Sequence, residues 1–252
     1  MKIAIKHSGL LIEPDGTVAG HDAGETLVRR LLRVFPGAQL VAPQVHRYPN
    51  FDAAPVELLD ADQTVVINMD VIDSTAVWQT LRANTEHPKV MNFMWWNWTR
   101  YHSTEELATL SLSCALFPTF ANSERTAKAI QEYVRRWTVP PLAERSRVSW
   151  VNLGVRLEHV QPRQEPERPV VLYPAIYMSE RKQPQQFLDI VSKVAKKTPI
   201  RVEARLAEQH LVSQQAMALS RNKWAWVGPL TPSRQQYWEA LAATTAFSAT
   251  AQ

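Results

Sequence analysis

An aromatic cluster directly after an apolar run offers the clearest binding chemistry in the sequence. The run Lys89 to Met94 (KVMNFM) has β character, and residues 95–102 read WWNWTRYH. Indole rings stack on sugars and nucleobases, so Trp95, Trp96 and Trp98 are candidates for contacting an acceptor. The competing interpretation is an aromatic core patch. Because alternate side chains of a strand point to opposite faces, we expect at least one of the three indoles to be partly exposed.

The loop at residues 16–24 is a second candidate for ligand contacts. It follows the first apolar run, Lys2 to Lys6, and it contains Gly20, His21 and Asp22. Ligands of open α/β folds bind at the carboxyl ends of parallel strands. Gly20 and His21 are therefore candidates for contacting a diphosphate or an acceptor, and an ordinary surface loop is the alternative.

Composition and spacing argue against several other chemistries. The seven histidines show no H-x3-H spacing, and the single cysteine, Cys114, excludes an internal disulfide and a cysteine zinc site. We therefore expect no metal and no cofactor, and a reducing, cytoplasmic setting. No apolar stretch of about 18 residues predicts a membrane span. The net charge of +4 favours an anionic partner, such as a sugar nucleotide, a nucleic acid or an anionic lipid.

The elements that must position these residues alternate between strand and helix patterns, which predicts an α/β fold with a mostly parallel sheet. Strands are predicted at residues 2–6, 39–42, 64–69, 89–94, 115–121, 148–152, 170–173, 200–204, 223–227 and 245–249. Helices are predicted around residues 27–35, at 75–83, from Asn122, from Pro184 and from Thr231-Pro232.

A proline-rich charged segment divides the chain. Residues 161–169 (QPRQEPERP) contain three prolines and four charges and no apolar residue, a composition typical of a linker. We predict an N-terminal domain at 1–160 and a second domain at 170–252. The second domain looks unfinished, so we expect a truncated product whose natural form continues past Gln252.

Several segments, in order, resemble the retaining glycosyltransferases of family 4, which have the two-domain GT-B fold. Asn122-Ser123-Glu124 resembles the family's N-S-E step, and residues 151–155 (VNLGV) resemble its "I-P-N-G-V-D" strand end. Residues 170–182, with Glu180-Arg181-Lys182, resemble the entry to the donor domain, and residues 226–230 (WVGPL) resemble its "v-f-G-x-v" loop. The arginine of the family's "GRl" motif is absent here.

The resemblance implies two Rossmann-like domains, the second incomplete, and a site without metal. It implies donor contacts from Gly20, His21, Arg181, Lys182, Gly228, Pro229 and Leu230. It implies acceptor contacts from Trp95, Trp96, Trp98, Asn122, Ser123 and Glu124. The family often places a histidine near the aromatic cluster, so His102 and Asn97 are the candidate catalytic residues.

The resulting prediction is a metal-independent, retaining transfer of a sugar from a nucleotide sugar. The acceptor, whether a glycan, a nucleic acid or a small molecule, is not specified by the sequence. The alternative is a non-catalytic module that binds nucleic acid or glycan through its basic surface and tryptophans.

Overall fold

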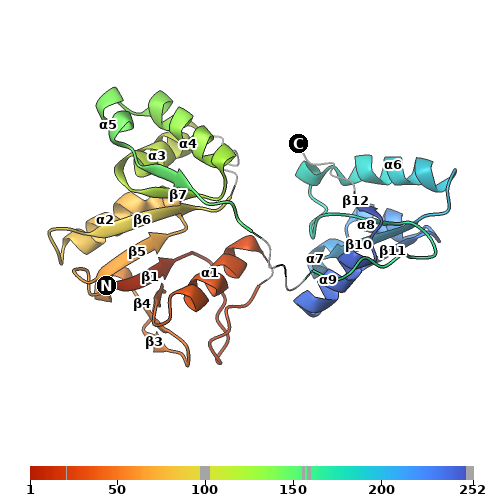
Figure 1. Cartoon of the computed structure of the whole chain (residues 1–252), viewed down its shortest axis with the longest axis horizontal. Helices are drawn as coiled ribbons and strands as arrows, with labels where there is room; N and C mark the ends of the chain where they lie inside the picture. The colour runs from red at the N-terminus through yellow and green to blue at the C-terminus, as the bar shows by residue number, and fades with distance from the viewer. Residues whose placement is uncertain (21, 97–102, 155–156, 158–159, 248–252) are drawn as a thin grey trace. The chain divides into compact units, whose positions relative to one another are not determined.

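The computed structural model describes residues 1–20, 22–96, 103–154, 157 and 160–247. The chain forms two compact units, Met1–Gly154 and Val155–Gln252 (Figure 1). Both units contain sheets and helices, so the predicted α/β class is confirmed. The segment predicted as a linker, 161–169, belongs to the second unit, where Gln164 N donates to Ala242 O at 2.9 Å.

The first unit is built on one eight-stranded sheet with the order β3-β4-β2-β1-β5-β6-β7-β8. All neighbouring strands are parallel except β3, which runs antiparallel to β4. The strands are β1 (Lys2–Lys6), β2 (Gln39–Val41), β3 (His46–Arg47), β4 (Asp52–Ala54), β5 (Thr64–Asn68), β6 (Lys89–Met94), β7 (Thr119–Ala121) and β8 (Val148–Trp150). From β1 the chain first adds β2 and β4 on one side, and it then crosses to β5 on the other side. The strand order therefore reverses between β1 and β5.

Helices pack on both faces of this sheet because successive residues of a strand point to opposite faces. Ile5 lies in an apolar cluster with Leu27 of α1, whereas its neighbour Ala4 lies in another cluster with Val77 and Leu81 of α2. Both strand residues are fully buried. The helical elements are α1 (Ala23–Val34), α2 (Ser74–Arg82), α3 (Thr104–Leu116), α4 (Glu124–Trp137), α5 (Pro140–Arg145), and the short 3-10 turns η1 (Val56–Leu58) and η2 (Val71–Asp73).

The second unit has a smaller sheet, parallel throughout, with the order β11-β10-β9-β12. Its elements are β9 (Val170–Leu172), η5 (Glu180–Lys182), α6 (Pro184–Ala195), β10 (Arg201–Leu206), α7 (Glu208–Leu211), α8 (Gln214–Ser220), β11 (Ala225–Pro229), α9 (Arg234–Ala242) and β12 (Ala246–Phe247). Phe187 of α6 packs with Val202 and Ala204 of β10. On the other face of β10, Glu203 is 9% exposed and forms ion pairs with Arg201 and Arg205, each at 3.0 Å. One face of this sheet is thus apolar and the other carries charge.

Several predicted boundaries were wrong for local reasons. The predicted strand at 115–121 shrinks to β7, because residues 115–116 end α3, a helix that the sequence reasoning missed. A capping box starts α3: Glu106 N donates to Ser103 Oγ and Ser103 N donates to the Glu106 carboxylate. Ser123, rather than Asn122, caps α4. Likewise, Ser233 caps α9, so that helix begins after Pro232.

No helix among the described residues is both long and apolar enough to cross a membrane.

Candidate functional site

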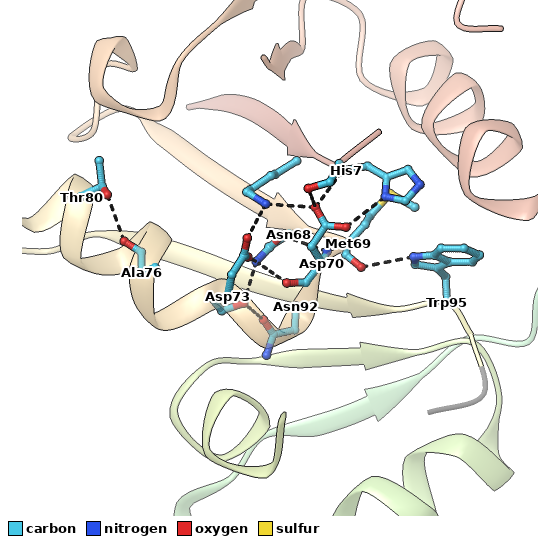
Figure 2. Close-up of polar contacts among 12 residues, drawn as sticks. His7, Asn68, Met69, Asp70, Asp73, Ala76, Thr80, Asn92 and Trp95 are labelled. Carbon is cyan, nitrogen blue, oxygen red and sulfur yellow. Dashed lines mark hydrogen bonds and ion pairs between the residues drawn. The ribbon is translucent and has the colours of Figure 1, made fainter. Parts of the chain in front are cut away.

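Charged and polar side chains meet at the carboxyl ends of β1 and β5, where the strand order reverses. Lys6 ends β1 and is followed by His7, while Asp70 and Asp73 follow the end of β5 (Figure 2). In open α/β sheets this position is where ligands bind, because the chain leaves the two strands in opposite directions and opens a crevice. Topology thus brings residues about 65 positions apart into one candidate site.

Asp70 lies at the centre of the cluster and is 20% exposed. Its carboxylate accepts hydrogen bonds from Lys6 Nζ at 3.0 Å, from Ser8 N at 2.7 Å and from Ser8 Oγ at 2.8 Å. His7 Nδ1 lies 3.2 Å from the other carboxylate oxygen. Burial alone would raise the pKa of Asp70, but the contacts with His7, Lys6 and Ser8 outweigh it and hold that pKa well below its usual range.

Lys6 bridges the two carboxylates of the site. Its ammonium is 3.0 Å from Asp70 Oδ2 and 2.6 Å from Asp73 Oδ2, and the side chain is only 14% exposed. Burial would lower the pKa of Lys6, but hydrogen bonds and charge from Asp73 and Asp70 raise it above its ordinary value. Lys6 therefore stays charged and fixes both carboxylates.

The His7 ring is oriented by three neighbours. A carboxylate can only accept, so the contact with Asp70 places a proton on Nδ1. On the opposite side of the ring, a Cβ added to Gly24 would lie 2.3 Å from Nε2, so only glycine fits at this position in the first turn of α1. The Trp95 indole meets the ring edge-on, with centroids 5.5 Å apart, and is itself held by a 3.2 Å bond from Nε1 to Met69 O.

A buried hydrogen-bond network of amides and a hydroxyl holds Asp73 in place. Asn68 Nδ2 donates to Asp73 Oδ1 and to Ser74 Oγ, both at 2.8 Å, and Ser74 Oγ donates to Asn92 Oδ1 at 2.5 Å. Asn92 Nδ2 in turn donates to Ser113 O at 3.1 Å. Asn68, Ser74 and Asn92 are completely buried. This network links β5, α2, β6 and α3, so it fixes the position of Asp73 relative to the sheet.

The predicted catalytic residues Asn97 and His102 lie outside the residues that the structure describes, as does Trp98. Trp95 and Trp96 are half-buried. They pack against two different apolar clusters of the first unit, Trp95 on the α1 side and Trp96 on the side of α3 and α4. Neither indole is completely buried, as the alternation of side chains predicts.

The segment predicted to contact the acceptor has structural partners of its own. Asn122 Nδ2 donates to Trp95 O at 3.0 Å, and Ser123 Oγ accepts from Thr126 N at 3.2 Å as the cap of α4. Glu124 forms an exposed ion pair with Lys128 at 2.8 Å. Asn122 therefore connects the end of β6 to the start of α4, and acceptor contacts from these residues stay a prediction.

The predicted donor residues of the second unit lie on loops at the carboxyl side of its sheet. Arg181 and Lys182 belong to η5, in the connection between β9 and α6, and Pro229 ends β11 just before Leu230. The next residue after Lys182, Gln183, has a left-handed φ of 46°, and Pro184 then begins α6. The connection thus turns sharply immediately before a helix N-terminus.

Two predicted glycine contacts have a packing explanation. A Cβ at Gly228 would lie 2.3 Å from the Trp226 ring, over which Arg205 Cζ stacks at 4.8 Å from the centroid. Gly228 therefore makes room for this indole. Gly20 has a φ of 103°, and a Cβ there would approach Glu25 Cδ to 2.8 Å. The neighbouring His21 lies outside the described residues.

The sequence reasoning missed the first-unit site, although a signal was present. His7, Asp70 and Asp73 are not among the candidate residues that the sequence patterns indicate. Each of two apolar runs is directly followed by polar residues. Residues 3–5 (IAI) precede Lys6 and His7, and residues 65–67 (VVI) precede Asn68. The pattern does not reveal that these two strands are neighbours, which is what joins the residues.

Metal ligation is not indicated by the described part of the chain, where no group of three or more His, Cys, Asp or Glu side chains could hold an ion. A scan against protein-family models and a search of curated proteins both find no match to this sequence.

Proposed function

We propose that the chain is a metal-independent glycosyltransferase that takes a sugar from a nucleotide sugar. The observation that carries this proposal is the duplication of one topology. In the first unit, the order β4-β2-β1-β5-β6-β7 is the 3-2-1-4-5-6 order of dinucleotide-binding sheets, and the second unit repeats 3-2-1-4. Two Rossmann-like units in succession are what the resemblance to GT-B enzymes implies.

The donor side of the proposal rests on the second unit. A diphosphate leaving group without a metal ion needs cations and helix N-termini to stabilise its developing charge. Lys182 precedes α6 by two residues, and Pro229-Leu230 follow a neighbouring strand end at the same side of the sheet. We therefore assign the diphosphate to the loop of Lys182 and the base to the loop after β11.

The acceptor belongs, in this proposal, to the first unit. The cluster of His7, Asp70 and Trp95 lies at the reversal point of its sheet and combines a proton acceptor with an aromatic surface. A sugar acceptor would present a hydroxyl to the polar groups and the apolar face of its ring to the indole. The single cysteine, Cys114, is in keeping with a cytoplasmic setting.

Nucleotide binding by the full chain tests the proposal. We expect calorimetry with UDP, GDP and ADP to identify one ligand, and Lys182→Ala to weaken it about 10- to 150-fold, the equivalent of about 1.5–3 kcal/mol for one charge-assisted contact. Lys193→Ala is the matched control, because Lys193 is exposed in the last turn of α6. Absence of binding to all three diphosphates would refute the donor assignment.

The alternative, a non-catalytic module that binds nucleic acid or glycan, has one observation in its favour. An open cavity of about 590 Å³ lies where β9, β10 and β11 begin, and its lining includes Arg168, Arg201, Lys223, Trp224 and Trp226. Cations beside indoles suit a phosphate backbone with stacked bases.

Titration of a labelled single-stranded oligonucleotide at two salt concentrations distinguishes the alternative. The affinity of such a module for the oligonucleotide should fall steeply as the salt concentration rises. Trp224→Ala should also weaken binding, because it removes a ring on which a base can stack. If the oligonucleotide does not bind, or if its affinity changes neither with salt nor upon Trp224→Ala, the binding-module alternative is refuted.

A further inference from the structure

The amino edge of the second sheet collects positive charge. Because its strands are parallel, the connections that enter β9, β10 and β11 all arrive at this edge. Residues 161–170, 196–201 and 221–225, which lie there and are called the cationic edge, contain seven Lys and Arg side chains and two Glu. All seven cations are exposed. The whole chain has a net charge of only +4, so its positive charge is concentrated at this edge.

Helix ends explain part of this charge. Lys196 and Lys197 follow the last turn of α6 and Arg221 follows α8, positions where the helix dipole favours a cation. The dipole does not account for Arg168 and Lys223, which line the cavity where β9, β10 and β11 begin. Neither of these two forms an ion pair with a carboxylate in the described part of the chain. They are therefore available to an anion.

The same cavity has a third cation and one carboxylate in its lining. Arg201 pairs with Glu203 at 3.0 Å, and Glu203 is also held by Arg205, so Arg201 shares this carboxylate with a second guanidinium. Glu167 is the only acidic side chain that lines the cavity. The lining thus keeps an excess of positive charge.

Two indoles form the apolar part of the cavity wall. Trp226 is fixed in one orientation, because Gly228 makes room for its ring and Arg205 stacks over it at 4.8 Å from the centroid. Trp224 is half-buried and packs against the apolar cluster of the sheet. The cavity measures about 590 Å³, within the range of about 300–1,000 Å³ that is usual for ligand pockets. A flat aromatic ring bearing a phosphate matches this combination of indoles and cations.

We propose that the cationic edge binds single-stranded nucleic acid, with one base against Trp224 in the cavity and neighbouring phosphates on Arg168 and Lys223. Seven exposed cations are more than one nucleotide can use, which favours a strand over a free nucleotide. A duplex is disfavoured because its bases are already stacked on one another. The inference goes beyond the proposed glycosyl transfer and does not depend on it, since the donor loops lie at the opposite edge of the same sheet.

The experiment measures binding of the full chain to a fluorescein-labelled oligothymidylate of about 12 nucleotides by fluorescence anisotropy. Each phosphate neutralised on a single strand contributes about 0.7 to the slope of log affinity against log salt. For about three to five such phosphates, affinity should fall about 20- to 130-fold between about 50 and about 200 mM salt.

Paired charge variants locate the binding surface. Arg168→Gln combined with Lys223→Gln removes two phosphate contacts, so the fall in affinity over the same salt range should shrink to about 3- to 20-fold. The matched control combines Arg33→Gln with Arg135→Gln, two exposed arginines in the last turns of α1 and α4. The control should behave as the unaltered chain does.

Variants of Trp224 test stacking. Loss of one stacked base, by Trp224→Ala, should weaken binding about 5- to 150-fold, whereas Trp224→Phe keeps a ring and should retain most of the affinity. Trp224 also packs against the apolar cluster, so Trp224→Ala can unfold the second unit. The tryptophan emission then decides: the oligonucleotide should quench it in the unaltered chain and less in Trp224→Phe. Equal quenching in both would place the base elsewhere.

The two proposals fail separately. Equal effects of the two paired charge variants, or heparin binding as tightly as the oligonucleotide, would show attraction by diffuse charge and overturn the nucleic-acid site. Free thymidine monophosphate binding as tightly as the strand would overturn the assignment to a strand. Lys182→Ala should leave the oligonucleotide affinity unchanged, because Lys182 lies at the carboxyl side of the sheet. Absence of oligonucleotide binding overturns this inference alone, while diphosphate binding still decides the glycosyltransferase.

Discussion

Replacing Asp70 by Asn should destabilise the first unit strongly, because the change removes a charge and keeps the shape. The carboxylate accepts from Lys6, from His7 and twice from Ser8, and an amide offers one acceptor oxygen in place of two. Removing one partner of a buried ion pair costs about 3–5 kcal/mol. Lys6 keeps its bond to Asp73, and Asp70 is 20% exposed, so we expect about 2–4 kcal/mol.

The measurement is hydrogen exchange of the β1 and β5 amides in the full chain, read by mass spectrometry, because it reports on the first unit alone. Asp52→Asn is the control. Asp52 pairs with Arg47 at 3.3 Å, but the two side chains are 47% and 89% exposed. Such an exposed pair contributes about 0–1 kcal/mol, so exchange should hardly change.

The destabilisation caused by Asp70→Asn should depend on pH. The pKa of Asp70 is lowered in the folded chain, whereas an unfolded aspartate titrates near about 3.9. Its stabilising contribution is therefore present above about pH 4 and is lost as the pH falls toward the folded pKa. The difference between the unaltered chain and Asp70→Asn should shrink in acid. An equal difference at pH 7 and at pH 2.5, or none at pH 7, would refute the reasoning.

Three further predictions follow from close packing and burial. Gly24→Ala should displace the His7 ring, whose Nε2 lies 2.3 Å from the added Cβ, and the imidazole NMR signals should shift while the melting temperature drops by a few degrees. Gly228→Ala should force the Trp226 indole, 2.3 Å from the added Cβ, off the sheet and change its fluorescence; an unchanged spectrum would show that the ring has room. Cys114 should resist iodoacetamide at pH 8 in the folded chain, because burial raises its pKa to about 12, and should react once urea unfolds it.

The alternation of apolar runs and helical patterns was sufficient to predict most of the elements. Residues 89–94 and the helix from Pro184 match β6 and the start of α6, since strand character and a proline at the first helical position are local properties. The helix α3 escaped prediction because apolar residues such as Leu110, Leu112 and Leu116 lie around it, so no single face stands out.

The site itself depends on which strands are neighbours. The sequence places His7 after one buried strand and Asp70 after another, but nothing local indicates that β1 pairs with β5 and not with β4. The tertiary structure decides this, because β2 and β4 add to one side of β1 and force β5 to the other. The crossover brings the two strand ends together, and only then does the carboxylate of Asp70 meet the imidazole of His7 and the ammonium of Lys6.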